Sequence, residues 1–220
     1  ARLFAPHIQG GGEGGQDRGG QVTVVCGVHG GVGATTLAVN LALQLEDVTR
    51  GHVALLDLHL RGGAAAMMLG ARVTSGLRVA LEEPDRVDSL FLDRVAVPLG
   101  ERMRLIAAEE PMESDTQPTE EGVRRVLEML RQRFNHVVVD LPMPPGPVER
   151  LALQRARHVV LVLGPDVASI RDTVAVKKVV SMTGSAGRVI TVLNGAGRKG
   201  YLPLKLVAEG IGTPPEVVIP

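Results

Sequence analysis

Five short apolar runs, separated by segments with helical spacing, restrict this chain to an α/β fold. Each run is nearly continuous in valine, leucine and isoleucine, as expected of a strand that is buried on both faces. Strands that alternate with helices form a mostly parallel sheet with helices on both faces, and we predict that architecture here. The runs occupy residues 22–26, 53–56, 137–139, 159–163 and 189–193.

The helix that follows Pro118 has the clearest periodic pattern. Apolar residues recur at helical spacing within 123–134, and Thr119 is placed to cap the helix start. Acidic residues follow the cap and arginines lie in the last turn, which suits the helix dipole. Earlier in the chain the pattern is weaker, and we predict two short helices at 64–69 and 77–81.

The first residues differ in composition from the remainder of the chain. Glycine and polar side chains dominate 1–21, which leaves little apolar surface to bury. We therefore predict a flexible linker over 1–21 and one folded domain over 22–220. Because the chain begins with Ala1 rather than Met, we expect a further domain upstream of the linker.

The composition argues against several classes of function. The 24 basic and 24 acidic side chains cancel, which gives no general attraction to nucleic acid or anionic lipid. Aromatic residues make up only 2% of the chain, and the single cysteine, Cys26, cannot form an intrachain disulfide or a thiolate cluster. No apolar stretch reaches the roughly 18 residues of a membrane span, and no signal peptide pattern is present. We expect a cytoplasmic protein without direct contacts to nucleic acid.

A glycine-rich segment follows the first apolar run and leads into a helical pattern. It contains Gly30, Gly31 and Gly33, with Val32 between them, and continues as Ala34-Thr35-Thr36. A strand, a glycine turn and a helix N-terminus together bind anions, because backbone N–H groups and the helix dipole favour negative charge there. Thr35 is placed to contact a magnesium ion.

This segment resembles the deviant Walker A motif of the MinD/ParA family, Lys-Gly-Gly-x-Gly-Lys-Thr-Thr, but both lysines are missing. The lysine that reaches the partner's nucleotide in a dimer falls on His29, and the phosphate-binding lysine falls on Ala34. The resemblance implies ATP or ADP with Mg²⁺ as ligands and a homodimer as the assembly. The cofactor-binding residues that it implies are Gly30, Gly31, Val32, Gly33, Ala34, Thr35, Thr36, Asn194 and Pro220.

The resemblance extends to residues that follow other apolar runs. Asp57 matches the first carboxylate of the family's switch I region, and the second carboxylate is replaced by His59, which we interpret as an exposed loop histidine. Asp140 matches Walker B, so the implied metal residues are Thr35, Asp57 and Asp140. Asn194 matches the asparagine that contacts adenine in the family. The end of the chain, 217–220, is similar to the family loop that closes over the base.

Loss of the phosphate-binding lysine has a predictable cost. A hydrogen bond to a charged group contributes about 1.5–3 kcal/mol, so its absence weakens ATP binding about ten- to a hundred-fold. Hydrolysis suffers more, because positive charge matters most where charge develops in the transition state. We expect very weak or no ATP hydrolysis.

The resemblance narrows to the CpaE/TadZ branch, over residues 22–220, through the glycine segment, 57–62, 77–97 and 194–220. It implies a localisation and assembly factor for a Tad (Flp) type IV-like pilus. The implied partners are pilus and secretion-machine proteins, with recruitment to the inner membrane or cell pole. A basic group at Arg198, Lys199 and Lys205 is either an ordinary solvated loop or a partner-binding patch.

Several alternatives remain at the level of sequence. An active MinD/ParA-type positioning ATPase is disfavoured by Ala34, and a nucleotide-free interaction scaffold would leave the glycine segment without a ligand. A tyrosine kinase of related fold needs the missing lysine and a tyrosine-rich tail, whereas Tyr201 is the single tyrosine. A nitrogenase-reductase-like electron carrier needs more cysteine ligands than Cys26 supplies.

Overall fold

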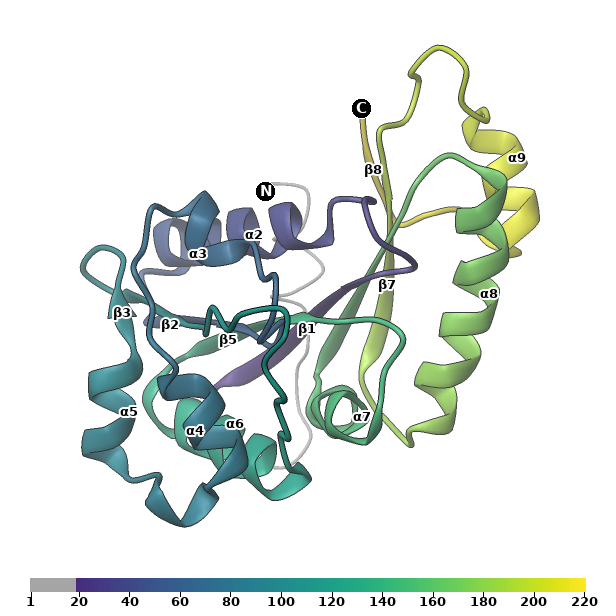
Figure 1. The fold of residues 1–220 in the computed structure, drawn as a ribbon. Helices are drawn as coiled ribbons and strands as arrows, with labels where there is room; N and C mark the ends of the chain where they lie inside the picture. Colours follow the sequence, from purple (N-terminus) through teal and green to yellow (C-terminus); the bar gives the residue numbers. More distant parts are fainter. Residues whose placement is uncertain (1–18) are drawn as a thin grey trace.

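The computed structural model describes residues 19–220, which form one eight-stranded sheet covered by helices (Figure 1). The strand order is β3-β4-β2-β5-β1-β6-β7-β8, and every neighbouring pair is parallel except β3 with β4. The strands are β1 (Gln21–Gly27), β2 (Val53–Asp57), β3 (Val97–Pro98), β4 (Met103–Ile106), β5 (His136–Leu141), β6 (His158–Leu163), β7 (Arg188–Asn194) and β8 (Val217–Ile219).

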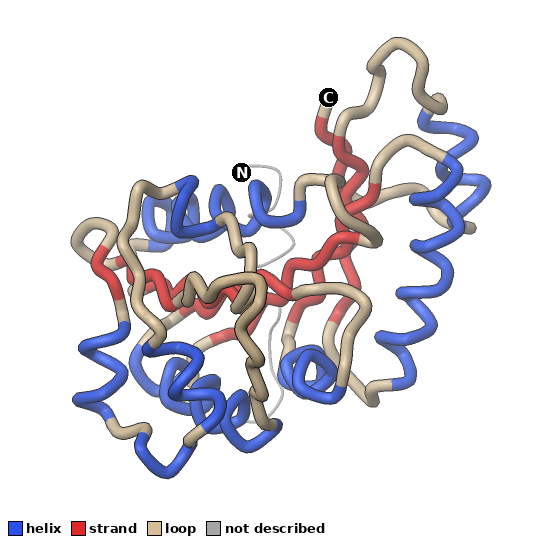
Figure 2. Tube along the Cα trace, in the orientation of Figure 1, coloured by secondary structure: helices blue, strands red, loops and turns tan. Residues whose placement is uncertain are grey.

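Helices cover both faces of the sheet, as the alternating pattern predicted. In Figure 1, α2 and α3 lie above the sheet, α4, α6 and α7 lie below it, and α8 and α9 line its right-hand end; Figure 2 shows the strands passing between these layers. The helices are α2 (Ala34–Thr49), α3 (Ala65–Met68), α4 (Gly76–Glu82), the 3₁₀ turn η1 (Pro84–Arg86), α5 (Ser89–Val95), α6 (Glu120–Arg133), α7 (Pro147–Arg155), α8 (Val167–Met182) and α9 (Leu204–Ile211).

All five predicted strands are present, and each is one to three residues longer than its apolar run. Both predicted short helices are also present, as α3 and α4. The strands β3 and β4 were not predicted, because Val97–Pro98 has two residues and Arg104 interrupts the apolar pattern of Met103–Ile106. The prediction of a loop at 217–220 was wrong over Val217–Ile219. This segment forms β8, which pairs with the backbone groups of β7 that would otherwise lie at the sheet edge.

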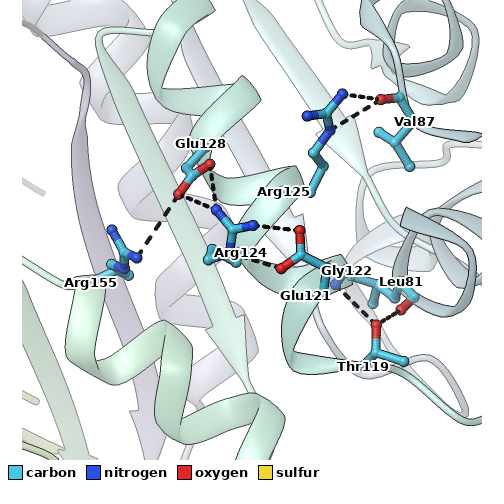
Figure 3. Close-up of polar contacts among 9 residues, drawn as sticks. All are labelled: Leu81, Val87, Thr119, Glu121, Gly122, Arg124, Arg125, Glu128 and Arg155. Atoms are coloured by element: carbon cyan, nitrogen blue, oxygen red, sulfur yellow. Dashed lines mark hydrogen bonds and ion pairs between the residues drawn. The ribbon is translucent and has the colours of Figure 1, made fainter. Parts of the chain in front are cut away.

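The start of α6 is capped as the sequence predicted. Thr119 Oγ1 accepts a hydrogen bond from the Gly122 N–H at 3.0 Å and donates one to the Leu81 carbonyl at 2.8 Å (Figure 3). A Cβ on Gly122 would lie 2.1 Å from the Leu81 oxygen, so only glycine lets the end of α4 approach this closely. The cap therefore also joins α6 to α4.

Charged side chains on the outer surface of α6 are paired with one another (Figure 3). Arg124 contacts both Glu121 and Glu128, and Arg155 of α7 lies 3.9 Å from Glu128. Arg125 donates to the Val87 carbonyl at 3.1 and 3.3 Å. These partly exposed contacts fix the outer helix layer while the opposite side of α6 packs on the sheet, with Val123, Val126, Leu127 and Leu130 buried.

The first described strand begins one residue before the predicted boundary at 22. Gln21 is the first residue of β1, and the Gly20 N–H donates to the Arg131 carbonyl at 2.7 Å. A Cβ on Gly20 would lie 1.8 Å from the Phe134 oxygen, which explains a glycine at this contact. The rest of the predicted linker, residues 1–18, lies outside the described residues. Within 19–220, no helix combines the length and apolar character needed to cross a membrane.

Candidate functional site

The parallel sheet brings the glycine segment and two acids to one edge. β1, β5 and β2 are neighbours, so their carboxyl ends lie together, where open α/β sheets bind ligands. Asp57 ends β2 and is the register partner of Asp140 on β5, while Asp140 also pairs with Val25 of β1. Both carboxylates are buried, with Asp57 1% and Asp140 0% exposed. Strand register alone therefore places two acids side by side beneath the glycine segment.

Two glycines of the segment have left-handed backbone conformations. Gly31 has φ +83° and Gly33 has φ +92°, a region that non-glycine residues seldom occupy. Gly33 is also the N-cap of α2, and a Cβ there would lie 2.5 Å from Asn194 Nδ2. Within the described part of the chain, the N–H groups from Gly30 to Thr36 donate to no backbone carbonyl.

A cavity of about 370 Å³ lies over these N–H groups. Its volume falls within the range of small-molecule sites. It is lined by Gly27, His29, Gly30, Gly31, Val32, Gly33, Ala34, Thr35, Thr36, His59, Leu141 and Met143. The seven predicted residues from Gly30 to Thr36 thus share one cavity with His59, and the first residues of α2 are among those that line it.

Asn194 and Pro220 are placed apart from this cavity lining. Asn194 Nδ2 donates to the Val32 carbonyl at 2.8 Å, so its amide supports the glycine segment from behind. Pro220 follows β8, whose Ile219 pairs with Asn194. The predicted contact of Asn194 and Pro220 with a nucleotide base stays a prediction.

His59 is bound to the acid pair instead of lying free in a loop. His59 Nδ1 is 2.9 Å from Asp57 Oδ1 and 3.6 Å from Asp140 Oδ2, and the imidazole is 30% exposed. The His59 N–H also donates to Asp57 Oδ1 at 2.9 Å. His59 does lie in a loop, as interpreted, but the prediction that it is exposed was wrong, because its side chain is half-buried against the acids. The Asp-x-His spacing brings the ring back over the carboxylate two residues earlier, which was the available signal.

Burial and neighbouring groups shift the pKa values of Asp140 and His59. Burial raises the pKa of Asp140 to about 6, the nearby Asp57 charge adds to the rise, and the Thr35 hydroxyl and His59 oppose it. Thr35 lies close enough to act on this carboxyl, but neither Asp140 oxygen has a partner in hydrogen-bond geometry. For His59, burial opposes the charged form, yet the hydrogen bond to Asp57 and the charges of Asp57 and Asp140 raise its pKa overall.

The residues fit a bound cation at this position. Asp140 is fully buried and both of its oxygens lack partners, which is costly for a carboxylate unless a cation or water satisfies it. The donor types offered by Asp57, Asp140 and Thr35 are the oxygen ligands that Mg²⁺ prefers. When bound, such an ion would offset the charge of phosphate groups in the cavity.

His29 stands where the family resemblance expects the lysine that reaches the partner's nucleotide. His29 Nε2 contacts Ser169 Oγ at 3.0 Å, and Ser169 Oγ donates to Asp166 Oδ2 at 2.9 Å. The Gly164 N–H also donates to Ser169 Oγ, at 2.9 Å. His29 is thereby tied to the first turn of α8 in its own chain. The sequence offered no signal for this contact, because the two residues are far apart along the chain.

No lysine or arginine lies among the described residues that line the cavity. Ala34 occupies the first turn of α2, where the family resemblance expects the phosphate-binding lysine. A phosphate group here would therefore depend on backbone N–H groups, the α2 dipole, Thr35, Thr36 and a metal ion. The arrangement provides binding contacts and lacks a fixed cation for charge that develops during hydrolysis.

Cys26 takes no part in this chemistry. It is buried in β1, and burial together with the Asp140 charge raises the pKa of its thiol to about 12. A thiol with this pKa stays protonated near neutral pH, so it is neither a metal ligand nor a nucleophile there. The basic group is likewise separate: Arg198 and Lys199 are exposed, and Lys205 lies 4.0 Å from Glu209.

Comparisons with known proteins give a distant relative and a shared fold. No family model matches the chain. The septum site-determining protein MinD of Synechocystis sp. is 24% identical over 153 residues, which are 69% of this chain and 56% of that protein. The chain therefore spans little more than half of the length of that relative.

Solved structures give the same picture at the level of the fold. A ParA family ATPase from Chlorobium tepidum superposes with a TM-score of 0.81 and 21% identity, over 91% of this chain and 84% of that one. MinD from Pyrococcus horikoshii, in complex with Mg-ADP, gives a TM-score of 0.72 and 21% identity, over 91% and 81%. This chain has the P-loop NTPase fold of MinD and ParA proteins.

Proposed function

We propose that this protein is a degenerate member of the MinD/ParA family that binds ATP or ADP with a divalent cation and turns it over very slowly or not at all. One observation carries the proposal. The residues from Gly30 to Thr36, whose N–H groups donate to no backbone carbonyl, line a 370 Å³ cavity beside two buried carboxylates, and no lysine or arginine is among the described residues that line it. Contacts that can bind phosphate are retained, but the lysine side chain whose positive charge supports fast hydrolysis is missing.

The residues of the site have separate roles in this proposal. Gly30, Gly31 and Gly33 let the backbone approach phosphate oxygens, and Thr36 lies beside them. Thr35, Asp57 and Asp140 hold the cation. A Cβ on Gly30 would meet no atom within 4 Å, so the space beside it is open to a ligand. In the proposal, Asn194 and Pro220 would contact the base of the nucleotide.

The decisive experiment is a calorimetric titration of the purified domain with Mg·ATP. We expect binding in the micromolar to submillimolar range, because backbone N–H groups and the cation remain while the lysine is absent. The blocked control is Gly33→Glu, since any side chain at φ +92° is strained and its Cβ would meet Asn194. A matched control is Gly184→Glu, which carries the same change at φ +71° in open space far from the cavity.

The two outcomes separate the candidate functions. Binding that Gly33→Glu abolishes and Gly184→Glu retains would support a nucleotide-dependent protein. No heat signal at millimolar ATP, from protein with an unchanged melting temperature, would contradict the proposal and favour a nucleotide-free interaction scaffold. A turnover number near one per second would instead favour an active positioning ATPase.

At the cellular level we propose a localisation and assembly factor for a Tad (Flp) type IV-like pilus. Support comes from the resemblance of the glycine segment, 57–62, 77–97 and 194–220 to the CpaE/TadZ branch. Partners would be pilus and secretion-machine proteins at the inner membrane or cell pole. In cells that carry the gene, its deletion should abolish surface pili, and wild-type but not Gly33→Glu protein should restore them. Normal piliation after deletion would exclude this role.

The same proposal includes a homodimer or a monomer–dimer equilibrium. Position 29 is a histidine, and it contacts Ser169 of its own chain, so the proposed dimer would form without the lysine that the resemblance expects at this position. Multi-angle light scattering with and without Mg·ATP would measure the assembly. Monomer alone at high protein concentration with ATP would contradict the dimer.

A further inference from the structure

Three donor atoms from two neighbouring strand ends converge beside the cavity. Asp57, His59 and Asp140 each offer one ligand atom, and these atoms all lie within 4.8 Å of one another. His59 Nδ1 is 2.9 Å from Asp57 Oδ1 and 3.6 Å from Asp140 Oδ2. The nitrogen thus stands between two carboxylates that strand register has already placed side by side.

These separations match those of atoms that share one small metal ion. First-row divalent ions bind imidazole nitrogen and carboxylate oxygen at about 2.0–2.2 Å. Two ligands at such distances are about 3.0 Å apart when adjacent in an octahedron and about 3.4 Å apart in a tetrahedron. The observed 2.9 and 3.6 Å therefore allow a shared ion with little movement of the side chains.

A second observation points to a ligand at this place. Asp140 is 0% exposed, and neither of its carboxylate oxygens has a hydrogen-bond partner. An ionised carboxylate buried without a hydrogen bond is disfavoured, and the His59 nitrogen, 3.6 Å from Asp140 Oδ2, lies beyond hydrogen-bond distance. A cation between these groups would stabilise the ionised carboxylate. Gly63 contributes on the other side, because a Cβ there would lie 2.7 Å from Asp57 Oδ2 and would close the space around that oxygen.

The nitrogen donor changes which ion the site prefers. Oxygen ligands alone suit Mg²⁺, whereas an imidazole nitrogen suits zinc, iron, nickel and copper, and affinity for a given site rises from Mn²⁺ through Co²⁺ to Cu²⁺. We infer that Asp57, His59 and Asp140 bind a first-row transition ion directly, with Mn²⁺, Co²⁺ or Zn²⁺ held more tightly than Mg²⁺. The inference refines the metal position of the proposed nucleotide site, but the ion binds without nucleotide.

The geometry leaves room for further ligands. His59 and Thr35 both line the cavity, so the ion would face it with open coordination positions. Open positions are the mark of metal sites that bind a substrate or water, in contrast to closed structural sites. Phosphate oxygens in the cavity could occupy them. In this way the metal would supply positive charge next to the glycine segment, where Ala34 supplies none.

Metal titration of EDTA-treated, nucleotide-free protein tests the inference. Co²⁺ should bind at one equivalent with visible absorption bands and a dissociation constant at least about ten-fold below that for Mg²⁺. The His59 imidazole should show a cobalt-shifted resonance in the NMR spectrum. Competition of bound Co²⁺ with Mn²⁺, Zn²⁺ and Mg²⁺ would rank the ions.

His59→Asp is the informative variant, because it replaces nitrogen by oxygen at the same place. It should lower the preference for Co²⁺ over Mg²⁺ by about ten-fold or more while the protein stays folded. His52→Asp makes the same change at an exposed histidine outside the cavity and should leave the preference unchanged. Asp57→Asn, which keeps the shape of the side chain, should weaken the binding of both Co²⁺ and Mg²⁺.

The opposing results are distinct from those that concern the nucleotide. Equal Co²⁺ affinity in wild type and His59→Asp, or no Co²⁺ binding below one millimolar, would overturn the metal inference. Mg·ATP binding measured separately would still stand in either case. Co²⁺ binding without any ATP binding would contradict the proposed function and leave the metal site in place.

Discussion

The two sides of the cavity differ in how their charge is organised. On the glycine side, Ala34 carries no charge, His29 is engaged with Ser169, and backbone N–H groups provide the available donors. On the strand side, two buried carboxylates and His59 lie within 4.8 Å of one another. The glycine side depends on backbone geometry, whereas the strand side depends on charged side chains.

The contrast indicates which parts of the site tolerate sequence change. Backbone donors survive the loss of side chains, because they are fixed by the β1 strand, the left-handed glycines and the start of α2. Buried acids are different, since each one must be satisfied by a neighbour or a cation. Asp140 lacks hydrogen-bond partners, so it does not stabilise the fold by itself.

The largest expected effect concerns the buried acid. The pKa of Asp140 rises from 3.8 to about 6 on folding, so the folded state holds the proton more tightly than the unfolded state. Stability must then fall as the pH rises from about 4 to about 6, at a cost of about 3 kcal/mol by pH 7. His59 acts in the same direction, because its raised pKa stabilises the fold below pH 6.5 and this contribution is lost at higher pH.

Asp140→Asn would isolate this effect. In EDTA, urea unfolding from pH 4 to pH 8 should show wild-type stability falling with pH while the Asn variant loses much less. At pH 7 the variant should therefore be the more stable protein. Parallel pH profiles for the two proteins would show that the buried carboxylate is already satisfied without a cation, and the contrast between the two sides would fail.

A smaller effect is expected when charge is returned to the glycine side. Ala34→Lys should tighten Mg·ATP binding by about ten- to a hundred-fold, which corresponds to a charged hydrogen bond of about 1.5–3 kcal/mol. Calorimetry measures the affinity, and a phosphate-release assay reports any gain in turnover. Ala34→Met is the matched control of similar length without charge. Equal affinities for the Lys and Met variants would mean that phosphate does not lie beside α2.

The smallest effect is expected at His29. His29→Ala removes the contact with Ser169 and should lower the free energy of unfolding by about 1 kcal/mol, the usual net contribution of one hydrogen bond. Because His29 is engaged within its own chain, ATP affinity should change less than about three-fold. Chemical denaturation and calorimetry would check both values, with His52→Ala as an exposed control. A ten-fold loss of ATP affinity would show that His29 turns toward the phosphates.

Much of the fold could be predicted because its signals are local. Runs of valine and leucine gave the five central strands, and Thr119 with its flanking charges gave the α6 helix. The missed strands have weak local signals, since Val97–Pro98 has two residues and Val217–Ile219 is fixed by pairing with β7. The glycine segment was predictable as well, because backbone with positive φ angles favours glycine, which can be read directly from the sequence.

What the sequence determined by itself is the parallel α/β sheet, the glycine segment and the identity of the acids at the strand ends. Tertiary structure decided what those residues contact. The register of β2 with β5 places Asp57 beside Asp140. The loop after β2 brings His59 into contact with both acids. Ser169 of α8 contacts His29. These contacts join residues from separate strands and loops, and burial sets their charges. A local sequence pattern predicts neither these contacts nor the charge states, because both arise only when the chain packs.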